Sequence, residues 1–137
     1  MRLTSFTDYG LRALMRLAAD PDRGRSTADL AGELQISRHH LTKILQRLAR
    51  AGIVTTRRGG GGGAALAVSA GELQLGEIVR LLEEGQTLVE CFTPEGSDCT
   101  LLGSCRLKHR LRRAEAAFFA DLNQSTLADI AGPIGAY

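Results

Sequence analysis

Residues 37–54 read SRHHLTKILQRLARAGIV, and this stretch decides the fold. Ser37 is suited to cap the N-terminus of a helix, and Gly52 is suited to follow its last turn. Between them the apolar residues recur at helical spacing and predict one buried face, made of Leu41, Ile44, Leu45 and Leu48. The other face is polar, has no acid, and carries Arg38, His39, His40, Thr42, Lys43, Gln46, Arg47 and Arg50. An outer face of this kind favours contact with an anionic partner such as DNA.

Two shorter helices are predicted before this stretch. The first spans about Asp8 to Ala19 with Thr7 as its N-cap, and the second begins after a cap at Ser26 or Thr27. A three-residue break, residues 35–37, separates the second helix from the basic one. Two helices joined by such a turn predict a helix-turn-helix, whereas a generic pair of packed helices would not need the basic face.

A β-hairpin is predicted directly after the basic helix. Residues 53–56 are β-branched and read as a strand, and residues 64–68 can return as its partner. Two arginines and five glycines, residues 57–63, lie between them and predict the tip of a wing. A flexible linker has a similar composition, but the position after a helix-turn-helix favours the wing. The predicted DNA-binding residues are Ser37, Arg38, His39, His40, Lys43, Arg47, Arg57, Arg58, Gly59, Gly62 and Gly63.

Charge is divided unevenly along the 137 residues. Residues 1–68 hold eleven Lys and Arg against five Asp and Glu, a net +6, whereas residues 69–137 hold six against ten, a net −4. This asymmetry suggests an anionic partner for the first half, although solvated surface charge is the alternative. The first residues show no apolar signal-peptide core, so a cytoplasmic location is expected. No acid–base pair or nucleophile constellation indicates an enzyme.

The second half predicts two amphipathic helices and a short terminal turn. The first helix spans residues 71–84, the second about residues 106–124, and the turn residues 126–130. The longer helix would be about 28 Å long and carries an apolar stripe made of Leu107, Leu111, Ala114, Phe118 and Leu122. We expect this stripe to form a homodimer interface, with packing against the first helix as an additional role. The expected units are thus a DNA-binding domain (1–85), a loop (86–105), a dimerisation helix with its turn (106–130) and a disordered tail (131–137).

The loop holds all three cysteines, Cys91, Cys99 and Cys105, in the segment CFTPEGSDCTLLGSC. Thiolates suit iron–sulfur clusters, zinc and cuprous copper. Structural zinc sites usually contain a closely spaced cysteine pair, which is absent here, so the spacing favours a cluster over zinc, and zinc over unliganded cysteine. A fourth ligand is missing. His109, one turn past Cys105, is one candidate, and a carboxylate from another subunit is the other.

Several motifs together resemble the iron–sulfur winged-helix repressor family. They are LTSFTDYGLRALMRLA near the start, the basic helix, the glycine wing, the cysteine loop and LADI at residues 127–130. The resemblance covers roughly residues 1–130 and is strongest to the nitric-oxide-sensing branch, with the regulators of cluster biogenesis more distant. It differs in a long spacer between Cys91 and Cys99, and in Ala65 where some relatives carry a wing arginine.

The resemblance implies a homodimeric repressor that binds operator DNA and is released when its cluster is nitrosylated. It implies a 4Fe-4S cluster, with 2Fe-2S as the alternative, held by the three cysteines and by Asp8 of the partner subunit. Cluster-biogenesis regulators place a histidine three residues after the last cysteine, where this chain has Lys108 and has its histidine one position later. The alternative functions are a regulator of iron–sulfur or redox status, and a cluster- or zinc-stabilised interaction module that does not bind DNA.

Overall fold

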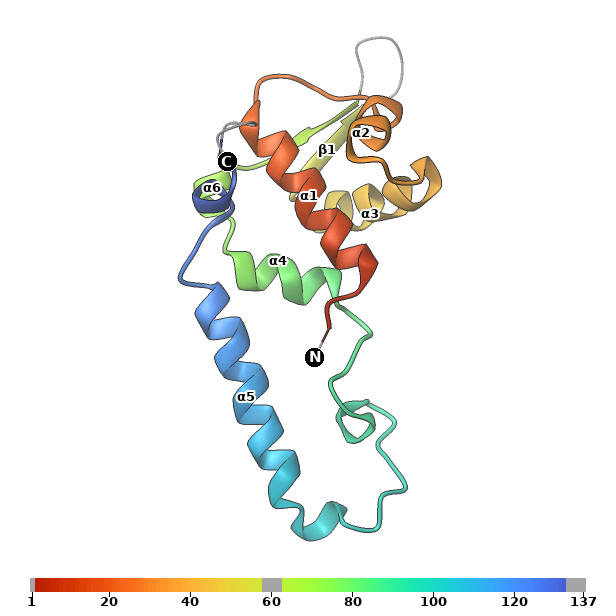
Figure 1. The fold of residues 1–137 in the computed structure, drawn as a ribbon, viewed down its shortest axis with the longest axis vertical. Helices are drawn as coiled ribbons and strands as arrows, with labels where there is room; N and C mark the ends of the chain where they lie inside the picture. Colours follow the sequence, from red (N-terminus) through yellow and green to blue (C-terminus); the bar gives the residue numbers. More distant parts are fainter. Residues whose placement is uncertain (1, 58–62, 133–137) are drawn as a thin grey trace.

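The computed structural model describes residues 2–57 and 63–132 and shows a mainly helical chain with one two-stranded hairpin (Figure 1). The helices α1, α2 and α3 and the hairpin form the upper body, and α5 extends away from it (Figure 1). The predicted winged helix-turn-helix with a long C-terminal helix is confirmed. The elements are α1 Ser5–Ala19, α2 Thr27–Leu34, α3 Arg38–Arg50, β1 Val54–Arg57, β2 Gly63–Leu66, the 3-10 turn η1 Ala70–Glu72, α4 Leu75–Leu82, the 3-10 turns η2 Glu90–Phe92 and η3 Leu102–Ser104, α5 Arg106–Leu122, and α6 Leu127–Ile130.

The helix-turn-helix has the boundaries that the sequence indicates. The Ser37 hydroxyl accepts a hydrogen bond from the His40 backbone N–H at 3.1 Å, and Ser26 does the same for Asp29 at 3.0 Å. Gly52 ends α3 with a φ of +77°, a conformation that favours glycine. Each helix therefore starts at a serine cap and runs to its expected end.

Two predicted helix starts are wrong. The first helix begins at Ser5 because Thr4, not Thr7, is its N-cap, and the Thr4 hydroxyl accepts from the Thr7 N–H at 3.3 Å. The helix predicted from residue 71 begins only at Leu75. Before it the chain makes the turn η1, and then Gln74 forms an antiparallel bridge with Thr126, which an α-helix would prevent.

One apolar core joins the helices. Leu14 and Leu17 of α1, Leu30 of α2, and Leu41, Ile44 and Leu48 of α3 are buried there, together with Ile78 and Leu82 of α4 and Leu127 of α6. The hairpin adds Val54 and Ala64. The helix α6 follows α5 in the sequence, contacts α1, and adds the buried Leu127 to this core.

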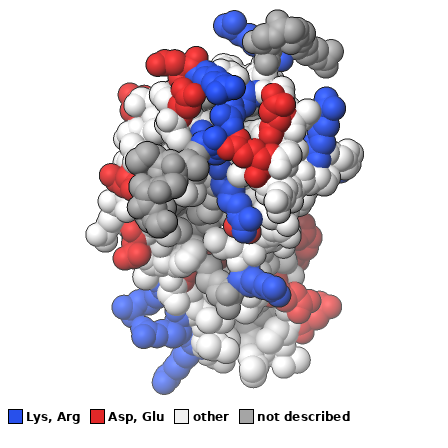
Figure 2. Space-filling model, turned by 45° about the horizontal axis from the view of Figure 1, so that its top comes forward, with Lys and Arg blue, Asp and Glu red and all other residues white. Residues whose placement is uncertain are grey.

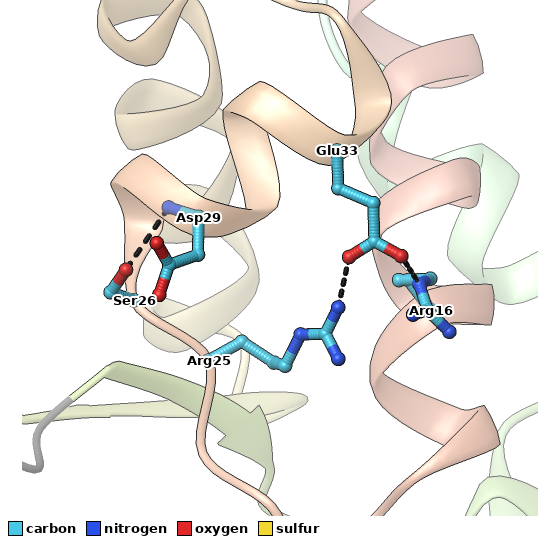
Figure 3. A network of polar contacts seen from close by, with 5 residues as sticks. All are labelled: Arg16, Arg25, Ser26, Asp29 and Glu33. Atoms are coloured by element: carbon cyan, nitrogen blue, oxygen red, sulfur yellow. Dashed lines mark hydrogen bonds and ion pairs between the residues drawn. The ribbon is translucent and has the colours of Figure 1, made fainter.

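The wing is attached to the body by backbone contacts. The strands pair antiparallel from Val54↔Leu66 to Arg57↔Gly63, and Ala64 also exchanges two backbone hydrogen bonds with Arg25, at 3.0 and 2.7 Å. A Cβ on Gly63 would lie 2.2 Å from the Arg25 carbonyl oxygen, so only glycine fits. The Glu33 carboxylate then accepts from both the Arg25 and Arg16 side chains, which ties the base of the wing to α2 and α1 (Figure 3).

The Glu33 network is ionic. Burial opposes its charge, but hydrogen bonds and the positive charges of Arg16 and Arg25 together hold the pKa of the Glu33 carboxyl below its ordinary value. The carboxylate is therefore ionised at neutral pH and bridges three segments of the DNA-binding half (Figure 3).

The joint between α4 and α5 is close and specific. The Asn123 side-chain oxygen accepts the Glu77 backbone N–H at 3.1 Å, and its nitrogen donates to the Glu77 carboxylate at the same distance. A Cβ on Gly76 would lie 2.3 Å from that Asn123 oxygen and 2.5 Å from the Phe119 carbonyl oxygen. Leu75 and Leu127 add backbone hydrogen bonds to Ser125 and Leu73. The C-terminal end of α5 is thus fixed to the start of α4.

In the part of the chain that the structure describes, no helix has the length and apolar character required to cross a membrane.

Candidate nucleic-acid interface and cysteine loop

The exposed face of α3 carries four of the predicted DNA-binding residues. They are Ser37, Arg38, His39 and Lys43, and Arg57 is exposed at the outer end of β1. Thr42, Gln46 and Arg50 are also exposed on α3. No acidic residue interrupts the helix. This face has the charge and the hydrogen-bond donors that base edges and phosphates require.

Arg47 does not lie on this face. Its guanidinium donates to the Leu82 carbonyl oxygen at 3.2 Å and stacks 4.3 Å above the centre of the Phe6 ring. It therefore joins α3 to the C-terminal end of α4 and to the first turn of α1. These contacts give Arg47 a structural role in place of the predicted DNA contact.

His40 also faces inward, toward α1. Its ring lies 5.3 Å from the Tyr9 ring, edge to face, and 5.9 Å from the Phe6 ring, and its residue is half-buried. His40, Ile44 and Arg47 stand at i, i+4 and i+7, and Ile44 is fully buried. The helical period could have placed both polar residues on the α1 side. His39, one position earlier, remains available to DNA.

The structure describes only Arg57 and Gly63 of the predicted wing residues. Gly63 serves the close approach to Arg25, a packing role that the DNA-binding prediction did not include. Arg58, Gly59 and Gly62 lie outside the described residues. Arg57 is therefore the wing cation that the structure places, at the outer end of β1.

The three cysteines occupy different local structures on one segment. Cys91 lies in η2 and is half-buried, Cys99 is exposed in the loop, and Cys105 is the N-cap of α5, where its sulfur accepts the Lys108 N–H at 3.3 Å. All three are free thiols. Within the described ranges no three His, Cys, Asp or Glu side chains are gathered as a metal site. The donor set fits a thiophilic group, because three accessible thiols share one loop, but the single chain does not bring them together.

The two candidates for a fourth ligand lie on different helices, Asp8 on α1 and His109 on α5. Asp8, in the first turn of α1, is half-exposed and accepts from the Arg12 Nε at 3.1 Å and from its Nη2 at 2.8 Å. His109 is exposed on α5, one turn past Cys105. Both side chains are accessible to a second subunit.

Glu83 was not identified from the sequence, yet it holds the start of α1. Its carboxylate accepts from the Thr4 backbone N–H at 2.7 Å and from the Thr4 hydroxyl at 2.9 Å. Burial opposes its charge, but hydrogen bonds from Thr7 and Thr4 keep the pKa of Glu83 below its ordinary value. The helix turn that carries Asp8 is thereby fixed to the residue that begins the cysteine-bearing connection.

The predicted dimer stripe is largely uncovered in the single chain. Leu107 is 64% exposed, Ala114 is exposed, and Leu111, Phe118 and Leu122 are half-buried. Phe119 is the one buried residue of α5, and the Arg80 guanidinium lies 4.0 Å from its ring centre. Packing within the chain therefore uses the Phe119 side of α5 and leaves Leu107 and Ala114 of the predicted stripe exposed.

The distribution of charge differs between faces. Figure 2 shows basic and acidic side chains side by side over the upper part of one face. In the Arg16–Glu33–Arg25 network, one carboxylate offsets part of the charge of two arginines. The outer face of α3 lacks this compensation because the helix has no acid. Uncompensated positive charge is what favours association with a polyanion.

Comparison with known proteins gives concordant results. Residues 3–133 match the Rrf2 family, described as an iron-dependent transcriptional regulator. The chain is 42% identical over 131 residues to the HTH-type transcriptional regulator NsrR of Geobacillus kaustophilus, covering 95% of this chain and 89% of the relative. It is 40% identical to NsrR of Shouchella clausii, covering 95% and 88%. The oxidised form of Staphylococcus aureus CymR has a similar structure, with a TM-score of 0.72, 30% identity and 96% of each chain covered. T. potens IscR shares the fold, with a TM-score of 0.73, 24% identity, and 95% and 85% covered.

Proposed function

Because the chain belongs to the Rrf2 family of transcriptional regulators, which are DNA-binding proteins and not enzymes, we propose that it is a nitric-oxide-responsive repressor. It binds operator DNA as a homodimer in the cytoplasm and carries an iron–sulfur cluster of the 4Fe-4S type. The observation that carries the proposal is the position of all three cysteines on one accessible segment, between the DNA-binding half and α5.

DNA binding is assigned to the outer face of α3 and to the wing. Arg38, His39 and Lys43 are exposed and point away from the core, so α3 can enter a major groove without breaking a contact of the fold. Arg57 adds a cation at the edge of the same surface. Two such surfaces in a dimer would read the two halves of a palindromic site.

The cluster ligands are assigned to Cys91, Cys99 and Cys105, and to Asp8 of the second subunit. A bound cluster supplies irons that react with nitric oxide. Thiolates hold such irons strongly, whereas a carboxylate is a harder and weaker ligand that is more readily displaced. To serve as the ligand, the Asp8 carboxylate must leave its pair with Arg12, an exposed contact worth little free energy.

Asp8 would connect the signal to DNA. It lies between Phe6 and Tyr9, whose rings contact His40 in the first turn of α3. A ligand on α1 that reaches the other subunit's loop would fix the relative position of the two α3 helices. A coupling of about 1–3 kcal/mol changes affinity roughly 5- to 150-fold, which is sufficient for a switch.

The proposal is tested with Asp8→Ala, with His109→Ala as its matched control. Asp8→Ala should bind a cluster with an altered absorption spectrum and a shorter lifetime, while the stability of the cluster-free protein changes little, because the lost Asp8–Arg12 pair is exposed. His109→Ala should match the wild type in both measurements. A His109→Ala protein that loses its cluster, beside an unaffected Asp8→Ala protein, would reject this ligand set. Absence of any iron in the anaerobically prepared wild type would reject the cluster itself.

A further inference from the structure

The segment 86–105 makes few hydrogen bonds to the rest of the chain. In the described residues its hydrogen bonds join positions within the segment, except at its two ends, where Gln86 donates to Glu83 and the Cys105 sulfur accepts the Lys108 N–H of α5. Its first residues, Gln86 to Leu88, border a hollow of about 230 Å³ beside Glu115 and Phe118 of α5. Farther along, one aromatic contact reaches another element: the Arg112 guanidinium of α5 lies 4.5 Å from the centre of the Phe92 ring.

This contact joins the two ends of the cysteine segment. Phe92 directly follows Cys91, and Arg112 lies seven residues past Cys105 on α5. Seven residues make nearly two helical turns, so Arg112 lies on the same side of α5 as Cys105, about 10 Å along the axis. Phe119, seven residues further, is buried against α4 on this same side. The exposed Arg112 therefore lies on the same side of α5 as Cys105 and the buried Phe119.

The turn that presents Phe92 is ordered by its own hydrogen bonds. The backbone N–H groups of Phe92 and Thr93 donate to the carbonyl oxygens of Val89 and Glu90 at 3.0 and 3.1 Å. The Thr93 hydroxyl lies 3.0 Å from the carbonyl oxygens of both Glu90 and Gly96 and can donate to either. Residues 89–96 thus behave as one local unit, and holding the Phe92 ring also holds Cys91.

We propose that Arg112 is a positioning residue that holds Cys91 near α5, the helix that Cys105 caps, before any metal is bound. The role in cluster binding rests on the function proposed above, but the contact itself belongs to the metal-free chain. Bringing the ends of a flexible loop together costs conformational entropy, and a pre-formed contact removes part of that cost. No ion pair within the described residues competes for Arg112.

The first test uses the metal-free, reduced protein and needs no cluster. Iodoacetamide is added, and alkylation of each cysteine is followed by peptide mass spectrometry, with exposed Cys99 as the internal reference. Arg112→Gln should raise the alkylation rate of half-buried Cys91 relative to Cys99 by about two- to five-fold, the range expected for an exposed cation–π contact. Phe92→Leu should do the same, and the double variant should show no further increase, because both changes remove one contact.

The matched control is Arg113→Gln, which removes the same charge from the neighbouring position, about 100° around the helix. It should not raise the Cys91 rate, and Arg112→Lys, which keeps a cation, should restore part of the protection. An equal effect from Arg113→Gln, or additive effects of Arg112→Gln and Phe92→Leu, would overturn the proposal. Removing a positive charge alone lowers thiolate reactivity, so a faster reaction reports loss of the contact.

The second test adds ferrous iron and sulfide anaerobically and measures the rate of iron–sulfur absorption. Arg112→Gln should form the chromophore about two- to five-fold more slowly than the wild type and Arg113→Gln. Equal rates in all three proteins would overturn the role in assembly. If the wild type itself forms no chromophore, the proposed cluster function fails, while the alkylation experiment still decides whether Arg112 holds Cys91.

Discussion

Replacing Gly76 by alanine should damage the joint between α4 and α5. The added Cβ would lie 2.3 Å from the Asn123 side-chain oxygen and 2.5 Å from the Phe119 carbonyl oxygen, closer than real Cβ atoms approach such neighbours. Asn123 can rotate away, but it then loses its hydrogen bonds to Glu77. The Phe119 carbonyl belongs to the backbone of α5, so the helix itself must shift.

The expected loss of stability can be worked out from these contacts. Overpacking of this kind costs about 1–3 kcal/mol. Loss of the Glu77 N–H hydrogen bond costs about 0.5–1.5 kcal/mol more. Alanine in place of glycine in a helix returns about 0.5–1 kcal/mol, and less near the helix start. We therefore expect a net loss of about 2 kcal/mol in the free energy of unfolding, which corresponds to roughly 5–10 °C in Tm.

Gly32→Ala provides the matched control, because Gly32 is also helical but has no atom within 4 Å of the added Cβ. It should stabilise the protein by about 0.5–1 kcal/mol. Both variants are measured by urea unfolding of the metal-free protein at one protein concentration. A Gly76→Ala protein as stable as Gly32→Ala would refute the close approach of α5 to α4.

Three further predictions concern the DNA face, the dimer and pH. Arg57→Ala should weaken DNA binding about equally across sequences and lower the slope of affinity against salt concentration by roughly one unit. Arg47→Ala should lower the stability of the fold and leave that slope unchanged. A slope that changes only in Arg47→Ala would reverse these assignments. Leu111→Glu should sediment as a monomer and lose operator binding, because a charge cannot be buried in a helix–helix seam; a dimer at all concentrations would place the interface elsewhere. A carboxyl with a depressed pKa stabilises the fold only while it is ionised, so the wild type should lose stability as the pH falls below 4.5 and through the lower folded pKa of Glu83. In acid unfolding, Glu83→Gln should lose less stability over that pH range. Identical curves for the two proteins would contradict the bonds between Glu83 and Thr4.

Local sequence signals were sufficient for the helix-turn-helix. Ser37 and Gly52 mark both ends of α3, and the apolar spacing between them identifies its buried face correctly. The start of α1 was missed because Thr4 and Thr7 are both good caps, and only the contact with Glu83, 79 residues away, favours Thr4. A cap selected by a tertiary partner cannot be read from the local sequence.

The functional residues were harder to assign than the fold. Composition marked α3 as basic, but it did not separate His39, which is exposed, from His40, which packs against α1. The packing roles of Gly63 and Gly76 depend on backbones that are distant in sequence. On α5 the spacing of apolar residues identified the stripe from Leu107 to Leu122 but not the buried Phe119. The reason is that apolar residues occupy two adjacent sides of this helix, and the sequence does not say which side packs within the chain.

The central claim, that an iron–sulfur cluster controls DNA binding, is tested most directly by one anaerobic titration. Nitric oxide is added to iron-loaded protein bound to operator DNA, and DNA binding and cluster absorption are recorded on the same sample. We predict that the two signals fall together, that affinity drops at least about five-fold, and that the triple variant Cys91→Ala, Cys99→Ala, Cys105→Ala binds weakly with or without nitric oxide. Operator affinity that stays constant while the cluster absorption disappears would contradict the account.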